Sequence, residues 1–317
     1  MVQCRLSGAS RYNGGLRNRM FERVSQTGWG AVSSGFASFP LPDGSVNVIV
    51  SEAGENGSAM LEDLRRVSGM SEVGKGRIRV RILPLTGKKS DRFYPNSPYI
   101  QVALPSENND EIRIFLGDYL NCERKLQVQL LKMVFFQTFF PSLLAGEMFL
   151  FHGALAVTES GQGILLCGPS GVGKSTACRK LAGKMQTLAE DFILLSKFNG
   201  KWFAQAAPTW SVWGFDKEEI VVSDICKIVP LNYMVLLNRG EARLEEFGKY
   251  GASLALSASF NDMTNWQTRA AVVPRDMRRQ LRTCAFEGVL DMTKKLSCYR
   301  MFSKLDTDIG ELLAVLK

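Results

Sequence analysis

The residues with the clearest chemical meaning form the octapeptide G-P-S-G-V-G-K-S at positions 168–175. It matches the pattern G-x-x-x-x-G-K-[ST], in which glycines let successive backbone N–H groups turn toward a polyphosphate. The lysine of the pattern, Lys174, can reach the outer phosphates, and the hydroxyl of Ser175 can ligate Mg²⁺. The octapeptide predicts a site for a nucleoside triphosphate and Mg²⁺, and ATP is favoured because the sequence has no N-K-x-D guanine reader.

The segments on both sides of the octapeptide favour the same interpretation. The apolar run 163–167 is typical of a buried strand, and helical sequence begins at Thr176. A helix N-terminus carries partial positive charge and free N–H groups, so the order strand, loop, helix suits an anion. We expect nucleotide contacts from nine consecutive residues: Gly168, Pro169, Ser170, Gly171, Val172, Gly173, Lys174, Ser175 and Thr176.

Two adjacent acids follow at a spacing that fits phosphoryl transfer. Binding needs only the loop, whereas transfer or hydrolysis needs a carboxylate that holds Mg²⁺ or accepts a proton. Glu190 and Asp191 lie sixteen and seventeen residues beyond Lys174, which leaves room for one helix and a returning strand. The alternative is a pair of solvated acids at a strand edge.

His152 is the only histidine in the chain. A lone histidine on an apolar strand is more often a hydrogen-bonded core residue than a catalytic one. We expect its strand to lie beside the strand that leads into the octapeptide, which makes His152 a candidate catalytic residue. Both interpretations stay open at this stage.

The arrangement of these residues implies an α/β fold with three segments. Residues 1–120 form a small β-rich module, expected to be a half-exposed antiparallel sheet with loops at 53–58 and 84–98. Residues 121–147 hold a connecting helix, and residues 148–317 form the domain with the octapeptide. The expected strands are 46–50, 77–82, 99–103, 111–115, 148–157, 163–167 and 233–237, with a hairpin of 192–197 and 201–204; the expected helices are 123–140, 175–184, 241–250 and 309–316.

The charge of the chain favours an anionic partner. Thirty-nine Lys and Arg against 31 Asp and Glu give a net charge of +8. The sequence contains no helix-turn-helix, finger or RNP pattern, so ATP and an acidic substrate are preferred to a nucleic acid. Candidate contacts to the triphosphate or substrate are Arg239, Arg243, Arg269, Arg275, Arg278 and Arg279.

Cysteine usage and hydropathy predict a cytoplasmic protein. The seven cysteines are an odd number without a C-x-x-C pair, which is typical of reduced thiols. The most apolar segment, 133–145, is too short to cross a bilayer, so no membrane contact is expected.

Three segments together resemble the C-terminal kinase domain of HPr serine kinase/phosphorylase, which is similar in turn to ATP-dependent phosphoenolpyruvate carboxykinase. They are the His152-Gly-Ala-Leu-Ala strand, residues 163–175, and Leu188-Ala-Glu-Asp191. The family has an Asp-Asp pair where this chain has Glu190 and Asp191. In addition, Pro208-Thr-Trp-Ser211 resembles a segment of HPr-kinase-like proteins of peptide-modification gene sets, the ScmC group; the alternative is a surface turn with a half-buried Trp210.

The resemblance implies an HPr-kinase-like P-loop core that transfers a phosphoryl group from ATP to a hydroxyl, typically of serine. It makes Glu190 the general base and Asp191 the carboxylate at the metal, together with Ser175. It makes Lys174 the clamp on the phosphates and places His152 in the lining of the site. HPr kinases are hexamers, so a homo-oligomer is left open.

The predicted function is phosphorylation of a serine or threonine on a peptide or small protein. One alternative is a kinase for a free small molecule such as an amino acid. The other is a binding module that closes on a partner when ATP binds and performs no transfer.

Overall fold

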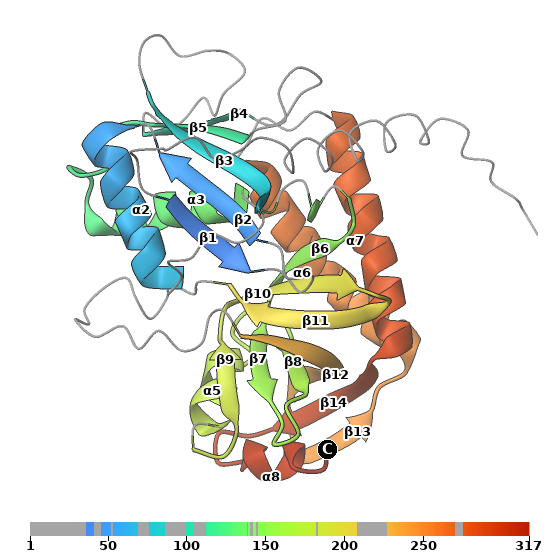
Figure 1. The fold of residues 1–317 in the computed structure, drawn as a ribbon. Helices are drawn as coiled ribbons and strands as arrows, with labels where there is room; N and C mark the ends of the chain where they lie inside the picture. Colours follow the sequence, from blue (N-terminus) through green and yellow to red (C-terminus); the bar gives the residue numbers. More distant parts are fainter. Residues whose placement is uncertain are drawn as a thin grey trace, which may run out of the picture.

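Two β-sheets organise the fold, one formed by the N-terminal third of the chain and the other by the rest (Figure 1). The computed structural model describes residues 36–40, 46–51, 53–68, 76–85, 99–103, 112–137, 139, 142–143, 145–181, 183–207, 227–269 and 275–316. Within these residues the first sheet has five strands and the second has nine. Helix α3, Arg124–Gln137, lies between the two sheets along the chain and confirms the predicted connecting helix.

The first sheet is mixed and has the strand order β1-β2-β3-β5-β4. β2, β3 and β5 are parallel, and β1 and β4 pair antiparallel at the two edges. The four predicted strands are present, but the prediction of an antiparallel sheet is wrong. The strands are β1 (Phe36–Pro40), β2 (Val46–Ser51), β3 (Gly76–Pro84), β4 (Ile100–Ala103) and β5 (Ile112–Leu116).

Helix α2, Gly54–Ser68, explains the parallel pairing. Parallel neighbours need a crossover connection, and α2 supplies it between β2 and β3. The loop predicted at 53–58 is therefore wrong. Its Gly, Ser and Asn residues disfavour a helix locally, but Met60, Leu61 and Leu64 are buried in the core, and this tertiary packing stabilises the helix.

The second sheet follows the order β6-β10-β11-β12-β8-β7-β9, and β14 pairs with both β12 and β13. The predicted hairpin is confirmed, since β10 and β11 are joined by Asn199 and Gly200 with φ of 47° and 75°. Two positive φ values are those of a type I′ turn, which matches the strand twist. The strands are β6 (Met148–His152), β7 (Ala154–Val157), β8 (Gly163–Cys167), β9 (Gln186–Ala189), β10 (Phe192–Phe198), β11 (Lys201–Ala206), β12 (Ile228–Arg239), β13 (Arg243–Glu246) and β14 (Ser297–Ser303).

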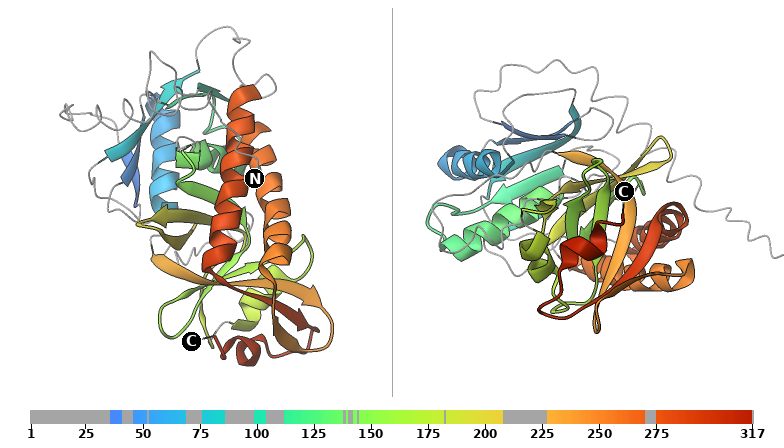
Figure 2. Two further views of the ribbon diagram at one scale, coloured as in Figure 1. Left: turned by 90° about the vertical axis from the view of Figure 1, so that its right-hand side faces the viewer. Right: turned by 90° about the horizontal axis from the view of Figure 1, so that it is seen from below.

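Helices cover both faces of this sheet. Successive residues of a strand point to opposite faces, so Leu165 of β8 joins the core with α6 and α7, while Ile164 and Leu166 join the core with α5 and α8. Figure 2 shows α6 and α7 side by side along the molecule. The helices are α5 (Lys174–Leu181), α6 (Lys249–Arg269), α7 (Arg275–Lys295) and α8 (Ile309–Leu313).

Two predictions for this region are wrong in detail. The predicted strand 148–157 is interrupted at Gly153, which separates β6 from β7. The predicted helix at 241–250 is instead strand β13, Arg243–Glu246, followed by α6. β13 pairs antiparallel with β14, and the guanidinium of Arg243 stacks 3.5 Å from the ring centroid of Phe302, so sheet pairing overrides the local helix preference.

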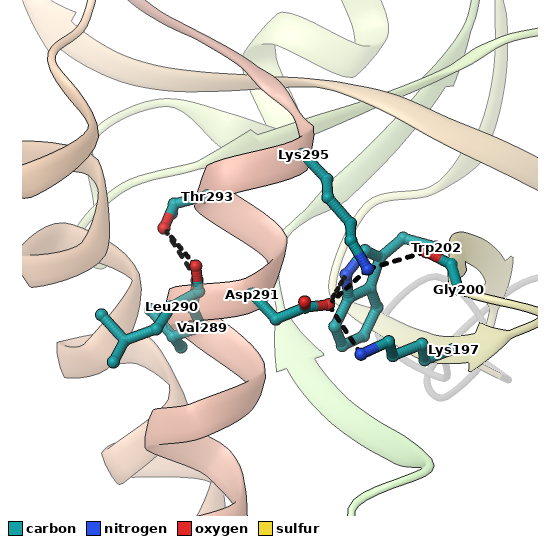
Figure 3. A network of polar contacts seen from close by, with 8 residues as sticks. All are labelled: Lys197, Gly200, Trp202, Val289, Leu290, Asp291, Thr293 and Lys295. Carbon is teal, nitrogen blue, oxygen red and sulfur yellow. Dashed lines mark hydrogen bonds and ion pairs between the residues drawn. The ribbon is translucent and has the colours of Figure 1, made fainter.

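Helix α7 is fastened to the hairpin β10–β11 by a polar network around Asp291 (Figure 3). The Oδ2 atom of Asp291 accepts hydrogen bonds from Trp202 Nε1 at 3.0 Å and from Lys295 Nζ at 3.1 Å, and it lies 3.0 Å from Lys197 Nζ. Lys295 Nζ also donates to the carbonyl oxygen of Gly200 at 2.8 Å. One carboxylate thus joins the helix to both strands of the hairpin.

Helix α3 packs between the first sheet and the start of the second. Its Val128, Leu131 and Val134 lie in one hydrophobic core with Met148 of β6 and Leu194 of β10. The division into three segments at residues 120 and 147 stays a prediction. The core that contains α3 includes residues from all three segments. In the described part of the chain, no helix is long and apolar enough to span a membrane.

Candidate active site

The strand ends around the glycine-rich loop, residues 168–175, meet at one edge of the second sheet. β8 and β12 are parallel with Cys167 opposite Leu236, so the loop after β8 and the end of β12 lie at the same edge. β7 is antiparallel to β8 and therefore begins at this edge, at Ala154. Ligands of α/β sheets commonly bind outside the carboxyl ends of parallel strands, which makes this edge the candidate site.

The loop packs on β12 at one end and is uncovered at the other. At Gly168 an added Cβ would lie 2.9 Å from the side chain of Val172 and 3.2 Å from the carbonyl oxygen of Leu237. Gly171 and Gly173 have φ of +76° and +113°, and a Cβ at either position would meet no atom of the described residues within 4 Å. The backbone of the loop therefore borders open space at these two glycines.

Lys174 is held at the loop by backbone carbonyl groups. Only 6% of its surface is exposed, and its Nζ donates to the carbonyl oxygens of Gly168 at 2.9 Å and Pro169 at 3.2 Å. Burial lowers the pKa of Lys174, while the negative potentials of Cys167 and of Asp191 act in the opposite direction. The ammonium thus lies within the field of Asp191 without forming an ion pair with it.

His152 and Asp191 come together because two strands bend at the same place. β6 continues into β7 at Gly153, and β9 continues into β10 at Glu190 and Asp191. The N–H of Gly153 donates to the carbonyl oxygen of Asp191 at 3.0 Å. Next to this hydrogen bond, His152 of β6 lies opposite Phe192 of β10 in the antiparallel register. The His-Gly and Glu-Asp segments are therefore cross-strand neighbours at one bend.

Gly153 makes this bend possible. A Cβ at this position would lie 2.6 Å from the ring of Phe151 and 2.9 Å from the carbonyl oxygen of Leu166. A side chain would therefore collide with backbone that cannot move without disturbing the pairing of β7 with β8. The glycine therefore lets the backbone of residue 153 pack against Asp191, next to His152.

His152 is partly exposed and not enclosed in the core, and its catalytic role stays a prediction. Its Nε2 lies 3.4 Å from Oδ1 of Asp191, with 37% and 23% of the two side chains exposed. The imidazole ring also lies 5.8 Å, centroid to centroid, from the ring of Phe192. Of the two interpretations left open by the sequence, the core histidine is therefore excluded.

The charge of Glu190 acts on a group of helix α5. Burial raises the pKa of the Cys178 thiol to about 12, and the charge of Glu190 adds to the increase. Cys178 lies on α5, where its Sγ is 3.7 Å from the carbonyl oxygen of Ala189. Glu190 is therefore within electrostatic reach of Cys178 on α5, while Asp191 contacts His152.

Among the candidate arginines whose side chains the structure describes, Arg239 contacts the loop. Nη2 of Arg239, at the end of β12, donates to the carbonyl oxygen of Gly171 at 3.0 Å. Arg243 is engaged with Phe302 and pairs with Glu245 at 3.3 Å. The other described candidates, Arg275, Arg278 and Arg279, are exposed on the first turns of α7, at the opposite end of the molecule from α5 (Figure 1).

Two further sequence predictions lie outside what the structure describes. They concern the side chain of Arg269 and the segment Pro208–Ser211 with Trp210. The predicted metal contacts of Ser175 and Asp191 stay predictions: no group of three or more His, Cys, Asp or Glu that could hold a metal ion is found among the described residues. The five described cysteines are free thiols, as the sequence predicts.

The sequence analysis missed Lys132 of α3. Burial lowers the pKa of Lys132, and the charge of Asp191 opposes this shift, so the lysine lies within the electrostatic reach of the site. Its ammonium is 5.5 Å from the ring centroid of Phe192. The one available signal was a single charge within the long apolar stretch of the connecting helix.

The chain is similar to one protein family and to solved structures. A family model described as "SynChlorMet cassette protein ScmC" matches residues 120–310, which include α3, the loop and the Glu190-Asp191 pair. Among solved structures, the Hpr(Ser) kinase/phosphatase from Coxiella burnetii matches with 10% identity and a TM-score of 0.30, over 53% of this chain and 87% of that chain. A search of proteins with curated functions found no match.

Proposed function

The chain belongs to the SynChlorMet cassette protein ScmC family, and we propose that it is an ATP-dependent kinase with an HPr-kinase-like P-loop core. The acceptor is a serine or threonine hydroxyl of a peptide or small protein. The observation that carries the proposal is the meeting of three parts at one sheet edge: the glycine-rich loop, Lys174, and the His152–Asp191 pair 3.4 Å apart.

The loop fits the phosphate chain of ATP. Its backbone is uncovered at Gly171 and Gly173, and Lys174 stands at the first turn of α5, where the helix N-terminus favours an anion. Among the described residues, Lys174 donates to loop carbonyls and to no acid, so its ammonium can turn to a phosphate oxygen without breaking an ion pair with any of them. Arg239 steadies the loop through the carbonyl group of Gly171.

The donor set also suits Mg²⁺. The ion prefers oxygen ligands such as hydroxyl and carboxylate groups, and Ser175 and Asp191 would hold it. When bound, it would neutralise charge that develops on the phosphates during transfer.

In the proposed reaction, the acceptor hydroxyl oxygen forms a bond to the γ-phosphorus of ATP. The bond from this phosphorus to the β–γ bridging oxygen breaks, and its electron pair leaves with ADP. The hydroxyl proton passes to the carboxylate of Glu190 or Asp191. His152 orients Asp191, and catalysis is mainly positioning and charge stabilisation.

Labelled ATP tests this function. Wild-type protein is incubated with Mg²⁺, labelled ATP and host lysate, and separately with free serine and threonine. We expect acid-stable phosphate on a peptide or small protein. Lys174→Met should lower this transfer at least about a hundredfold. The matched control Lys184→Met removes a lysine that pairs with Asp308, away from the loop, and should transfer at the wild-type rate.

The alternatives give different results in the same experiment. Label on free amino acids and on no peptide would show a small-molecule kinase. Saturable binding of ATP without any labelled acceptor would show a nucleotide-gated binding module. Lack of nucleotide binding would overturn the assignment of the site.

A further inference from the structure

Lys132 places in the candidate site a positive charge that the proposed reaction does not use. It is the only charged residue between Leu126 and Glu147. Its neighbours Leu130, Leu131 and Val134 are buried in the core. Lys132 is therefore a charged side chain next to buried apolar ones. Desolvating a charge is costly unless the charge is paired.

The ammonium of Lys132 faces the bend that carries Asp191. It lies 5.5 Å from the ring centroid of Phe192, the residue after Asp191. The imidazole of His152 lies 5.8 Å from the same ring, centroid to centroid. Lys132, Phe192, His152 and Asp191 thus form one cluster, to which helix α3 and the second sheet both contribute.

In the part of the chain that the structure describes, the Lys132 ammonium makes no hydrogen bond and no ion pair, and it lies 5.5 Å from the centroid of the Phe192 ring. Burial lowers the pKa of Lys132, and the attraction of Asp191 only opposes the shift. An ammonium has three N–H donors, and here none has an acceptor among the described residues. The group is therefore available to an anion that is not part of the chain.

The position of Lys132 assigns this anion to the acceptor side. Lys174 approaches Asp191 from the loop that would hold the nucleotide, whereas Lys132 approaches from α3, along β6 and β10. Accepting the proposed kinase function, we propose that Lys132 binds an acidic side chain close to the acceptor hydroxyl of a peptide. The net charge of +8 favours the same class of acceptor.

A position-scanned peptide library tests this inference with the full-length protein. Each peptide contains one serine, and each flanking position carries aspartate, alanine or arginine in turn; the measured quantity is kcat/KM with ATP and Mg²⁺. We expect the wild type to prefer aspartate over alanine at one position by about tenfold, the contribution of one charge-assisted hydrogen bond.

Variants at residue 132 should change this ratio in a defined way. Lys132→Gln should bring the aspartate-to-alanine ratio close to one, Lys132→Glu should make arginine the preferred residue, and Lys132→Arg should retain the aspartate preference. The matched control Lys125→Glu makes the same charge change on the exposed first turn of α3 and should keep the wild-type ratio.

The outcomes separate this inference from the proposed function. If the Lys132 variants lose activity equally on every peptide, the lysine positions Asp191 or assists the migrating phosphoryl group, and acceptor recognition is refuted. If the wild type phosphorylates peptides without any preference for acidic residues, the inference also fails while the kinase function stands. If no peptide is phosphorylated at all, the proposed function itself is wrong.

Discussion

Two clusters in this molecule combine an aspartate with two lysines, and they are organised in opposite ways. Around Asp291, Lys197, Lys295 and the indole N–H of Trp202 all lie within 3.1 Å of a single carboxylate oxygen. Around Asp191, neither Lys174 nor Lys132 makes an ion pair with the carboxylate. One lysine donates to loop carbonyls, and the other faces an aromatic ring.

The difference shows how to distinguish a structural charge from a functional one. Groups that pair with each other, as around Asp291, join a helix to a hairpin and neutralise one another's charges. Around Asp191, the two lysines lie in the field of the carboxylate without forming an ion pair with it, so their charges are not neutralised by direct contact. We therefore expect substitutions to affect stability at Asp291 and activity at Asp191.

The largest effect is expected for Asp191→Asn. The variant keeps the size of the side chain but loses the charge that would hold Mg²⁺ or accept the proton, so phosphoryl transfer should fall by about a hundredfold or more. The melting temperature should change little, because the carboxylate makes no lysine ion pair. Initial rates of peptide phosphorylation and thermal melting measure the two effects. A variant with normal activity would refute the role of Asp191.

Asp291→Asn should show the reverse pattern. Two lysines and an indole N–H lose their common charged acceptor, and the free energy of unfolding should fall by about 1–2 kcal/mol. The midpoint of thermal unfolding should fall by roughly 2–6 °C. Below that temperature, the transfer rate should equal that of the wild type. Loss of activity without loss of stability would contradict the separation of the two clusters.

Arg239→Ala tests whether the hydrogen bond from Arg239 to Gly171 positions the loop. Removing the guanidinium leaves the carbonyl group of Gly171 without this donor, so the loop is less well positioned for the phosphates. We expect KM for ATP to increase about three- to tenfold, and kcat to change less. Arg243→Ala is the matched control, because Arg243 stacks on Phe302 away from the loop. An equal effect of both variants would count against the contact.

The smallest effect is the pH dependence of the Asp291 network. Burial raises the pKa of Asp291, but the hydrogen bonds from Lys197, Lys295 and Trp202 outweigh it and lower the pKa from 3.8. Because the pKa is lower in the folded state, this stabilisation is present above pH 3.8 and is lost as the pH falls through the folded-state pKa. Unfolding titrations should therefore show a difference between wild type and Asp291→Asn that shrinks below about pH 4.

Sequence patterns predicted the elements that depend on consecutive residues. The hairpin at Asn199-Gly200 and the octapeptide between β8 and α5 were found because turns and glycine-rich loops are encoded by local backbone preferences. Helix α2 was missed and β13 was predicted as a helix. Both depend on partners distant in the sequence, namely the first core and strand β14.

The sequence by itself determined the chemistry available to this protein: a glycine-rich loop with Lys174, an acid pair and one histidine. Only the tertiary structure decided how these groups combine, because pairing of strands sets neighbours that are far apart in the chain. It placed His152 beside Asp191, brought the charge of Glu190 within reach of α5, placed Arg239 against the loop and brought Lys132 near Phe192. Local preference specifies a turn or a loop, whereas the register of a sheet and the packing of a helix specify which charges meet.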